Sequence, residues 1–313
     1  MKPGFANLVD PAEPPHALRR AVVAIGNFDG VHRGHAAVAA EVCALAAQLG
    51  APAAAVTFEP HPADFFAGRQ VVFRLTPAEE KIRQLRALGL DGVVTLGFDA
   101  ALANLGAEQF VREVLVRRLD VGAVIVGADF QFGRNRLGSA EYLQDAGGRH
   151  GFAVKVVAKV KPKDELVPLS SSAIRTALES GALAGATAAL GRFYTVEGEV
   201  RTGQQLGRTL GVPTANLALP PTNRLAFGVY AVHVYVDGRQ YGGVASFGVR
   251  PSVDNGAPLL EAHLLHFSGD LYGRTIRVEF IAWLRGEAKF ASLDALRAEM
   301  QRDIARAKAL LAK

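Results

Sequence analysis

The sequence predicts two folds in succession: a doubly wound α/β sheet, and then a small antiparallel β-barrel that ends in a helix. Three observations support this fold class. The chain has 313 residues, which is more than one average domain. Its first part alternates short apolar runs with amphipathic helical stretches. After about residue 185, short β-type runs separated by glycine-rich turns replace that alternation. We therefore expect one domain at residues 1–185 and another at 186–313.

In the first part the apolar periodicity distinguishes strands from helices. It predicts strands at 21–25, 53–58, 92–96, 123–126 and 153–157, and helices at 35–49, 76–88 and 107–118. The helix at 76–88 has a distinct start, because Thr76 can cap it, Pro77 suits its first turn and Glu79 stands at the capping-box position. Strand–helix repeats of this kind build a parallel sheet that binds ligands at the carboxyl ends of its strands.

In the second part the β-type runs are closely spaced, which favours a barrel. Strands are expected at 194–200, 228–236, 241–247, 259–267 and 275–283. Ser292 can cap a final helix that packs on the barrel through an apolar stripe. The stripe consists of Leu293, Leu296, Met300, Ile304 and Leu311. Between the two parts, the alanine-rich segment 171–190 predicts short helices.

Composition excludes several classes of protein. The single cysteine, Cys43, excludes an intramolecular disulfide and a multi-thiolate zinc site, so a reducing compartment is expected. The net charge of +5 is mild and no dense Lys/Arg block of the kind found in nucleic-acid arms is present, so a polyanionic small molecule explains the charge as well as a nucleic acid does. No apolar run approaches the roughly 20 residues of a membrane span, and the first residues lack a signal-peptide pattern. We expect a cytoplasmic protein.

The strongest chemical signal follows the first strand, in Gly26-Asn27-Phe28-Asp29-Gly30-Val31-His32-Arg33-Gly34-His35. The pattern His-x-Gly-His is expected by chance about 0.02 times in a chain of this composition. Glycines at a strand-to-helix turn let backbone N–H groups approach a phosphate, and histidines there can donate to its growing charge. Two alternatives stay open: a metal site, for which no third ligand is evident, and a purely structural helix cap.

Three shorter motifs stand at expected strand ends or helix starts. They are Thr57-Phe58-Glu59-Pro60-His61-Pro62, Gly127-Ala128-Asp129-Phe130-Gln131-Phe132-Gly133 and Ser170-Ser171-Ser172-Ala173-Ile174-Arg175. By itself each can be only a turn, or a helix cap formed by Ser171 or Ser172. Arg175, one turn inside the last helix, is also suited to bind phosphates in a bidentate manner.

The first motif resembles the His-x-Gly-His signature of the nucleotidylyltransferase superfamily. Its longer form is similar to the FMN adenylyltransferase part of bacterial bifunctional riboflavin kinase/FAD synthetases, and the three shorter motifs follow in that family's order. The resemblance implies a Rossmann-like domain in which His32, His35 and Arg175 are catalytic. It implies that ATP contacts Gly26, Asn27, Phe28, Asp29, Gly30, Gly34, Ser171 and Ser172, and that the flavin contacts His61, Pro62, Asp129 and Phe132. Ser172 stands where the family usually has Thr, and Asp129 where many relatives have Asn.

A second signal lies in the barrel part, where a glycine-rich stretch leads to Val212-Pro213-Thr214-Ala215-Asn216-Leu217. Hydroxyl and amide oxygens are hard ligands that suit Mg²⁺ beside phosphate, although the string can also be a plain turn. It resembles the Gly-x-Pro-Thr-Ala-Asn motif of riboflavin kinases. The resemblance implies that Thr214 and Asn216 bind Mg²⁺ and that Gly203, Gly207 and Gly211 contact ATP phosphates.

The riboflavin kinase resemblance also gives roles to later residues. It implies that Glu261, in an alternating strand, is the catalytic base, and that Arg285 contacts the flavin. Without the resemblance, a lone strand Glu is a solvent-facing charge. Four residues replace those more common in relatives: Ser246, Phe247, Ser252 and His266.

These resemblances run from about residue 22 to 308 and imply a bifunctional enzyme that uses ATP and Mg²⁺ to convert riboflavin to FMN and FMN to FAD. Two alternatives are a different His-x-Gly-His nucleotidylyltransferase and a monofunctional FMN adenylyltransferase with a flavin-sensing barrel. We expect small molecules as partners, with no nucleic acid and no membrane, and a monomer or weak homo-oligomer.

Overall fold

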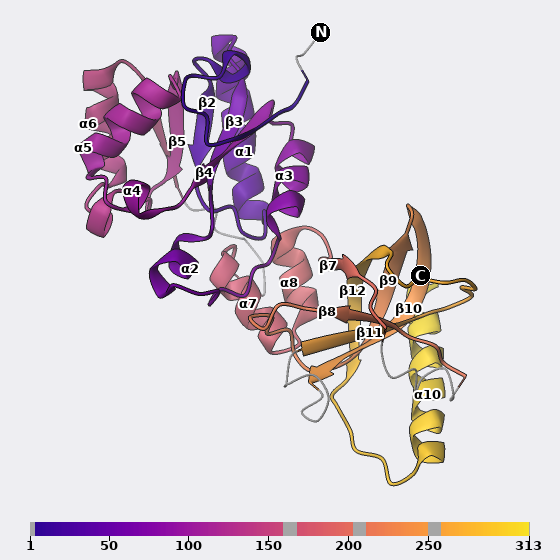
Figure 1. Ribbon diagram of the computed structural model, residues 1–313. Helices are drawn as coiled ribbons and strands as arrows, with labels where there is room; N and C mark the ends of the chain where they lie inside the picture. The colour runs from indigo at the N-terminus through magenta and orange to yellow at the C-terminus, as the bar shows by residue number, and fades with distance from the viewer. Residues whose placement is uncertain (1–3, 159–167, 203–210, 250–257, 313) are drawn as a thin grey trace. The chain divides into compact units, whose positions relative to one another are not determined.

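The computed structural model describes residues 4–158, 168–202, 211–249 and 258–312. The chain forms two compact units, Met1–Lys163 and Asp164–Lys313 (Figure 1). The first contains a parallel sheet with helices and the second an antiparallel, nearly closed barrel with a final helix, which confirms the predicted fold class. In the described part of the chain, no helix is long and apolar enough to span a membrane.

The first sheet has six parallel strands in the order β1-β4-β3-β2-β5-β6. They are β1 Ala6–Val9, β2 Val22–Ile25, β3 Ala53–Glu59, β4 Gly92–Gly97, β5 Ala123–Gly127 and β6 Ala153–Val157. All but β1 were predicted to within one residue; β1 is a short edge strand whose half-exposed residues give little signal. The chain leaves β2 for β3 on one side and reaches β5 on the other. The carboxyl end of β2 is therefore the topological switch point, where such sheets bind ligands.

Helices cover both faces of this sheet (Figure 1). The helices of this unit are η1 His16–Leu18, α1 Arg33–Leu49, α2 Pro62–Ala67, α3 Ala78–Ala87, α4 Ala100–Ala103, α5 Ala107–Gln109, η2 Phe110–Arg118, η3 Arg134–Arg136 and α6 Ala140–His150. Successive residues of β2 pack into different cores, as the period of a strand requires. Val22 joins the core that contains α1 and α3 residues, whereas Val23 joins the core with η2 and α6 residues.

Two predicted helix caps are wrong. Thr76 does not cap α3, which begins at Ala78 after Pro77; the Thr76 hydroxyl instead accepts from the N–H of Gly30 at 3.0 Å, so a tertiary contact replaces the local one. The capping box expected at Glu79 is therefore absent as well, because the Thr76 hydroxyl that would complete it binds Gly30. The helix after residue 170 is capped by Ser170, whose Oγ accepts from the Ala173 N–H at 3.2 Å.

Ser171 and Ser172 cannot take that role, because they lie inside the helix, whereas a cap residue needs the extended backbone that Ser170 has. The short helices expected at 171–190 are present in the second unit, as α7 Ser171–Glu179 and α8 Leu183–Leu190.

The barrel strands are antiparallel, in the order β7-β12-β9-β10-β11-β8. They are β7 Tyr194–Glu199, β8 Ala215–Ala218, β9 Gly228–Val236, β10 Arg239–Val249, β11 Pro258–Leu264 and β12 Thr275–Arg285. A bridge between Arg201 and Asn216 joins the two edges. β11 ends earlier than predicted, because His266 adopts a φ of +58° in the turn that follows. β8 was not predicted as a strand.

The final helix, α10 Leu293–Leu311, confirms the predicted cap and packing. The Ser292 Oγ accepts from the Ala295 N–H at 3.2 Å, and the helix contacts β9, β10 and β12 (Figure 1). Leu293 is 60% exposed, so the packed part of the apolar stripe begins one turn later, at Leu296.

Candidate functional site

The histidine motif lies at the switch point after β2 and opens α1. His32 is the N-cap, and its Nδ1 accepts from the N–H groups of Gly34 at 3.1 Å and His35 at 3.3 Å. A neutral imidazole that accepts at Nδ1 carries its proton on Nε2. The His35 ring stacks on the His32 ring with centroids 3.7 Å apart and meets the edge of Phe28 at 5.2 Å. The cap alternative and a ligand-binding role are therefore compatible, since Nδ1 serves the helix and Nε2 is a donor.

The backbone of this turn is strained. Gly30 has a φ of +86°, which glycine adopts freely, but Phe28 at +49° and Val31 at +38° are in a region that side chains with a Cβ avoid. Residues in such conformations persist only where surrounding contacts hold them, and they gather at binding sites.

The segment after α2 supplies those contacts. Asp29 is 2% exposed, and its carboxylate accepts from the N–H groups of Leu75 and Thr76, at 3.0 Å each. The Gly30 N–H donates to Thr76 Oγ1, also at 3.0 Å. The carboxylate predicted to contact ATP thus faces the interior, and it ties the turn to residues almost fifty positions away.

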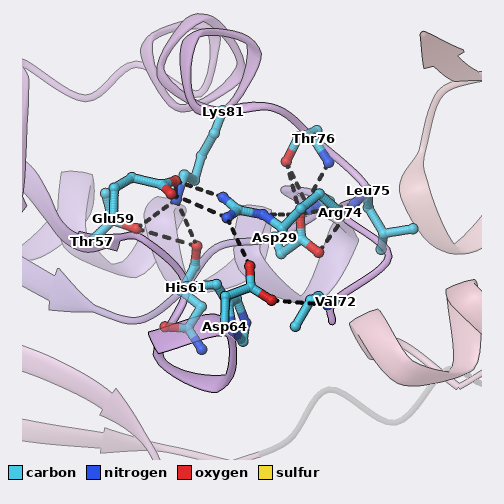
Figure 2. A network of polar contacts seen from close by, with 12 residues as sticks. Asp29, Thr57, Glu59, His61, Asp64, Val72, Arg74, Leu75, Thr76 and Lys81 are labelled. Atoms are coloured by element: carbon cyan, nitrogen blue, oxygen red, sulfur yellow. Dashed lines mark hydrogen bonds and ion pairs between the residues drawn. The ribbon is translucent and has the colours of Figure 1, made fainter. Parts of the chain in front are cut away.

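Next to these contacts lies a network of charged side chains (Figure 2). Glu59, at the end of β3, pairs with Arg74 at 2.6 Å and with Lys81 at 2.7 Å. The Arg74 guanidinium also lies 4.0 Å from both Asp29 and Asp64. The Asp64 carboxylate accepts from the N–H groups of residues 71 and 72. The network therefore links the end of β3, α2, α3 and the turn.

Burial and pairing act in opposite directions on these groups. Burial raises the pKa of Glu59, but hydrogen bonds from Arg74 and Lys81 outweigh it and hold that pKa below the ordinary value. Burial lowers the pKa of Lys81, and Glu59 offsets this only in part. The pKa of Arg74 is raised, because its carboxylate partners overcome the cost of burial. The pKa shifts of Glu59 and Arg74 therefore both favour the charged forms of these two groups near neutral pH.

The residues predicted to contact flavin lie after β3 and β5. His61 caps α2, with Nδ1 accepting from the Ala63 N–H at 3.1 Å, and Pro62 is the first residue of that helix. Asp129 is exposed just after β5, whereas Phe132 is 7% exposed and stacks on Phe130 with centroids 5.5 Å apart. Because β2, β3 and β5 are parallel neighbours, these segments share one edge of the sheet with the histidine turn.

The other residues predicted to act with the histidine turn lie in the second compact unit. Ser171 and Ser172 open α7, and Arg175 follows one turn later on the same helix, half-buried. The hydroxyl at position 172 is exposed. Ser171, Ser172 and Arg175 thus all lie on α7.

In the barrel, strand register brings together residues that are far apart in the chain. Glu261 on β11 is the direct partner of Asn216 on β8 and of Ser246 on β10. Arg285, predicted to contact flavin, lies at the end of β12 and forms an ion pair with the buried Asp303 of α10 at 2.8 Å. The predicted base and a predicted metal ligand are therefore neighbours on one face of the sheet.

A cavity of about 570 Å³ opens beside these strands, lined by Thr214 and Asn216 together with residues of the 267–272 segment. The Oδ1 atom of Asn216 is buried and has no hydrogen-bond partner among the described residues. His263, two residues from Glu261, contacts the Pro213 carbonyl oxygen through Nδ1 at 2.8 Å and so holds the strand start. Gly211 turns with a φ of +78°; Gly203, Gly207 and Ser252 lie outside the described residues.

The Asn216 environment fits a magnesium ion. A buried amide oxygen without a donor is costly, and a divalent cation can satisfy it. Mg²⁺ typically takes only one or two protein ligands and completes its shell with water and substrate phosphates, so Thr214 and Asn216 suffice chemically.

Sequence reasoning missed the charged network, in particular Arg74, Lys81 and Asp64. One signal was available. Lys81 lies one turn before the fully buried Leu85, and so on the interior face of an amphipathic helix. A lysine at such a position needs a buried partner.

Comparison with known proteins agrees with this division into two sites. The family model for FAD synthetase matches residues 15–173, and the family model for riboflavin kinase matches residues 190–311. Two relatives are bifunctional riboflavin kinase/FMN adenylyltransferases. The protein from Pseudomonas fluorescens is 42% identical over 96% of this chain and 95% of its own, and that from Escherichia coli K12 is 41% identical over 90% of each.

A crystal structure described as a macrolide-efflux protein from Streptococcus pneumoniae has a similar fold. Its TM-score is 0.84 at 28% sequence identity, over 97% of this chain and 99% of that one. The fold and the two candidate sites define a protein that joins a Rossmann-like α/β part to a small antiparallel β-barrel. The matches are more specific: the chain belongs to the family of bifunctional riboflavin kinase/FMN adenylyltransferases. They favour this family over the flavin-sensing alternative and over other nucleotidylyltransferases.

Proposed function

We propose that the two activities of this family, riboflavin kinase and FMN adenylyltransferase, are divided between residues 186–313 and 1–185 of this chain. The observation that carries the proposal is the order of the matches, with FAD synthetase at 15–173 and riboflavin kinase at 190–311. Each segment contains its own candidate phosphate site. The substrates are ATP, riboflavin and FMN.

In the adenylyltransferase part, a phosphate oxygen of FMN attacks the α-phosphorus of ATP, the bond to the β-phosphate oxygen breaks, and pyrophosphate leaves. The nucleophile is already an anion, so no base is needed. The protein's task is to position and to stabilise charge. His32 donates from Nε2, because Nδ1 is engaged at the helix cap. His35 stacks on it and acts with it on the phosphates. Arg175 of α7 has the phosphate-binding role that the family resemblance implies.

The glycine turn and the start of α1 supply the remaining phosphate contacts, through Gly26–Gly30 and Gly34, together with the hydroxyls of Ser171 and Ser172. His61, Pro62, Asp129 and Phe132 contact the flavin. These segments follow β3 and β5, the two strands that flank β2, which supports a shared site for His61 and Asp129.

In the kinase part, Glu261 accepts the proton of the riboflavin 5′-hydroxyl while that oxygen attacks the γ-phosphorus of ATP and ADP leaves. Thr214 and Asn216 would hold Mg²⁺, which neutralises charge on the phosphate oxygens. The pairing of Glu261 with Asn216 across β11 and β8 supports this assignment, because it sets the base beside the metal–phosphate position. Gly203, Gly207 and Gly211 contact the phosphates, and Arg285 contacts the flavin.

Incubation of the protein with riboflavin, ATP and Mg²⁺, followed by chromatographic separation of FMN and FAD, tests the proposal. Both products are expected. FAD formed only from supplied FMN would support the sensor alternative, and absence of both products would contradict the function. We further propose a monomer or weak homo-oligomer that binds no nucleic acid; light scattering and a salt-dependent gel shift test these two points.

A further inference from the structure

Lys81 is a buried cation that reaches the main chain of the histidine turn. It is 1% exposed, on α3, and its Nζ contacts three oxygens: Asn27 O at 3.2 Å, Thr57 Oγ1 at 3.1 Å and Glu59 Oε1 at 2.7 Å (Figure 2). The contact to Asn27 is to a backbone carbonyl in the middle of the turn. Lys81 therefore acts on the conformation of the backbone.

Peptide geometry gives this contact a direction. The peptide between Asn27 and Phe28 is planar and trans, so its C=O and its N–H point in opposite directions. Because Lys81 draws the Asn27 oxygen toward the interior, the N–H of Phe28 faces away from the ammonium group. The same contact helps to hold Phe28 at its strained φ of +49°.

The buried ion pair between Lys81 and Glu59 contributes little net stability to the fold. An apolar side chain of similar length would stabilise the fold as well or better, since desolvating an ammonium group and a carboxylate cancels most of their attraction. Leu85, one turn later on the same face of α3, is fully buried and apolar. Packing therefore does not explain the charge at position 81, whereas the hydrogen bond from Lys81 to the Asn27 carbonyl oxygen does.

Glu59 and Arg74 hold the ammonium group in place. Glu59 binds Lys81 through Oε1 and Arg74 through both carboxylate oxygens, at 2.6 and 3.1 Å. Arg74 is in turn next to Leu75 and Thr76, which bind the Asp29 carboxylate. The turn is thus fixed on two sides, at Asn27 and at Asp29, by one connected network.

We propose that Lys81, held by Glu59 and Arg74, is a positioning residue for adenylyl transfer: it fixes the Asn27–Phe28 peptide so that the N–H groups of the turn meet the ATP phosphates. This inference rests on the proposed function of the turn. Lys81 acts through Asn27 and does not touch substrate.

The test is Lys81→Met, which keeps the length of the side chain and removes its charge. Kinetics of FAD formation from FMN are measured with ATP and FMN varied separately, and FMN formation from riboflavin is measured on the same sample. We expect kcat/KM for ATP to fall about 10- to 100-fold. This is the range found when a residue that only orients a metal-binding side chain is replaced, and Lys81 has a comparable indirect role. The KM for FMN and the kinase activity should stay within about twofold of wild type, because neither depends on this peptide.

Two control variants separate positioning from stability. Leu85→Ala, on the same face of α3, should lower the denaturant midpoint for unfolding of the first unit and leave kcat/KM for ATP of the folded protein unchanged. Lys155→Met removes a lysine of the same unit whose ion pair with Glu41, at 2.6 Å, is on the surface, and it should change neither activity.

Glu59→Gln provides an independent measurement if Lys81→Met does not fold. It keeps the shape of the network but removes the carboxylate that raises the pKa of Lys81 against burial, with Arg74 and Asp29 as the remaining charged neighbours. The KM for ATP should then begin to rise at a lower pH than in wild type. An unchanged kcat/KM for ATP in Lys81→Met, or an unchanged pH profile of the KM for ATP in Glu59→Gln, overturns the inference. A wild-type protein that makes FMN but no FAD overturns the adenylyltransferase proposal instead, and this inference with it.

Discussion

The turn after β2 and the cavity beside β8 are both proposed to bind ATP phosphates, but they are built in different ways. In the turn, buried polar groups satisfy one another: the Asp29 carboxylate binds Leu75 and Thr76, and the Lys81 ammonium group binds the Asn27 oxygen. In the cavity, the buried Asn216 Oδ1 has no hydrogen-bond partner among the described residues.

This difference separates two ways of preparing a site for a polyanion. The turn is organised before any ligand binds, at the cost of strained backbone and a buried ion pair, so residues behind it should affect catalysis. The barrel cavity has a buried oxygen that no described protein group satisfies, so this site should depend more on a bound ligand. Substitutions in the turn and in the cavity can test whether the two sites differ in this way.

The largest effect is expected at Glu261. Glu261→Gln should lower the rate of FMN formation by about 10²- to 10⁴-fold, the usual contribution of a general base. FAD formation from supplied FMN should be unchanged, because that reaction needs no base. Single-turnover kinetics of both reactions on one preparation provide the measurement. Wild-type kinase activity in the Glu261→Gln variant would remove the proton-acceptor role.

His35→Ala should produce the reciprocal result with a slightly smaller effect. Loss of one donor to a developing phosphate charge lowers a rate about 10²- to 10³-fold, here that of FAD formation, while FMN formation remains. His150→Ala is the matched control, since His150 belongs to the same unit and binds Glu108 at 2.7 Å. If both histidine variants lose FAD formation equally, the effect is one of folding and the contrast between the sites fails.

The parts of these sites that sequence predicted are local. His32, Gly34 and His35 lie close together in the chain, so the strand, the glycine turn and the helix start were all visible within residues 22–35. Apolar periodicity predicted the strands other than β1 and β8 in the same way, whereas helices α2, α4 and α6 were not predicted. Family resemblance added the roles of single residues, such as Glu261, that periodicity alone leaves as surface charges.

The parts that were not predicted depend on distant partners. Thr76 was expected to cap a helix but binds Gly30, 46 positions away, and Lys81 reaches Asn27 across 54 positions. β8 has only four residues between turn formers, and its pairing with β11 makes it a strand. Local propensity carries no information on such contacts, because tertiary partners decide them.

Asn216→Leu tests the barrel side of the comparison between the two sites, and its expected effect is smaller than those of Glu261→Gln and His35→Ala. The substitution removes the unsatisfied oxygen at similar volume, so thermal unfolding of the ligand-free protein should be unchanged or occur at a higher temperature. FMN formation should need about 10- to 100-fold more Mg²⁺, or fail, in a Mg²⁺ titration, by analogy with the loss of residues that support metal ligands.

Asn223 offers a matched control for Asn216 in the same unit. It is also buried, but its amide donates to the Tyr194 hydroxyl and its oxygen accepts from the Leu225 N–H. Asn223→Leu should therefore destabilise the barrel by about 1–3 kcal/mol without changing the Mg²⁺ requirement. If Asn216→Leu destabilises as much as Asn223→Leu, the Asn216 oxygen is not the ligand-dependent group that the cavity suggests.

The smallest effect is expected from acid titration of the network behind the turn. The pKa of Glu59 is lowered from its ordinary value of 4.5 by Arg74 and Lys81, against the effect of burial. A carboxyl group with a lowered folded-state pKa contributes stability that is fully present above the unfolded value and is lost as the pH falls through the folded value. From near-neutral to acid pH, the first unit should therefore lose slightly more stability in wild type than in Glu59→Gln, whose amide does not titrate. Denaturant unfolding of both proteins at stepped pH measures this difference. Parallel curves would show that the pairing of Glu59 with Lys81 and Arg74 does not hold the carboxylate in its charged form, and the turn would then be less organised by charge than its geometry indicates.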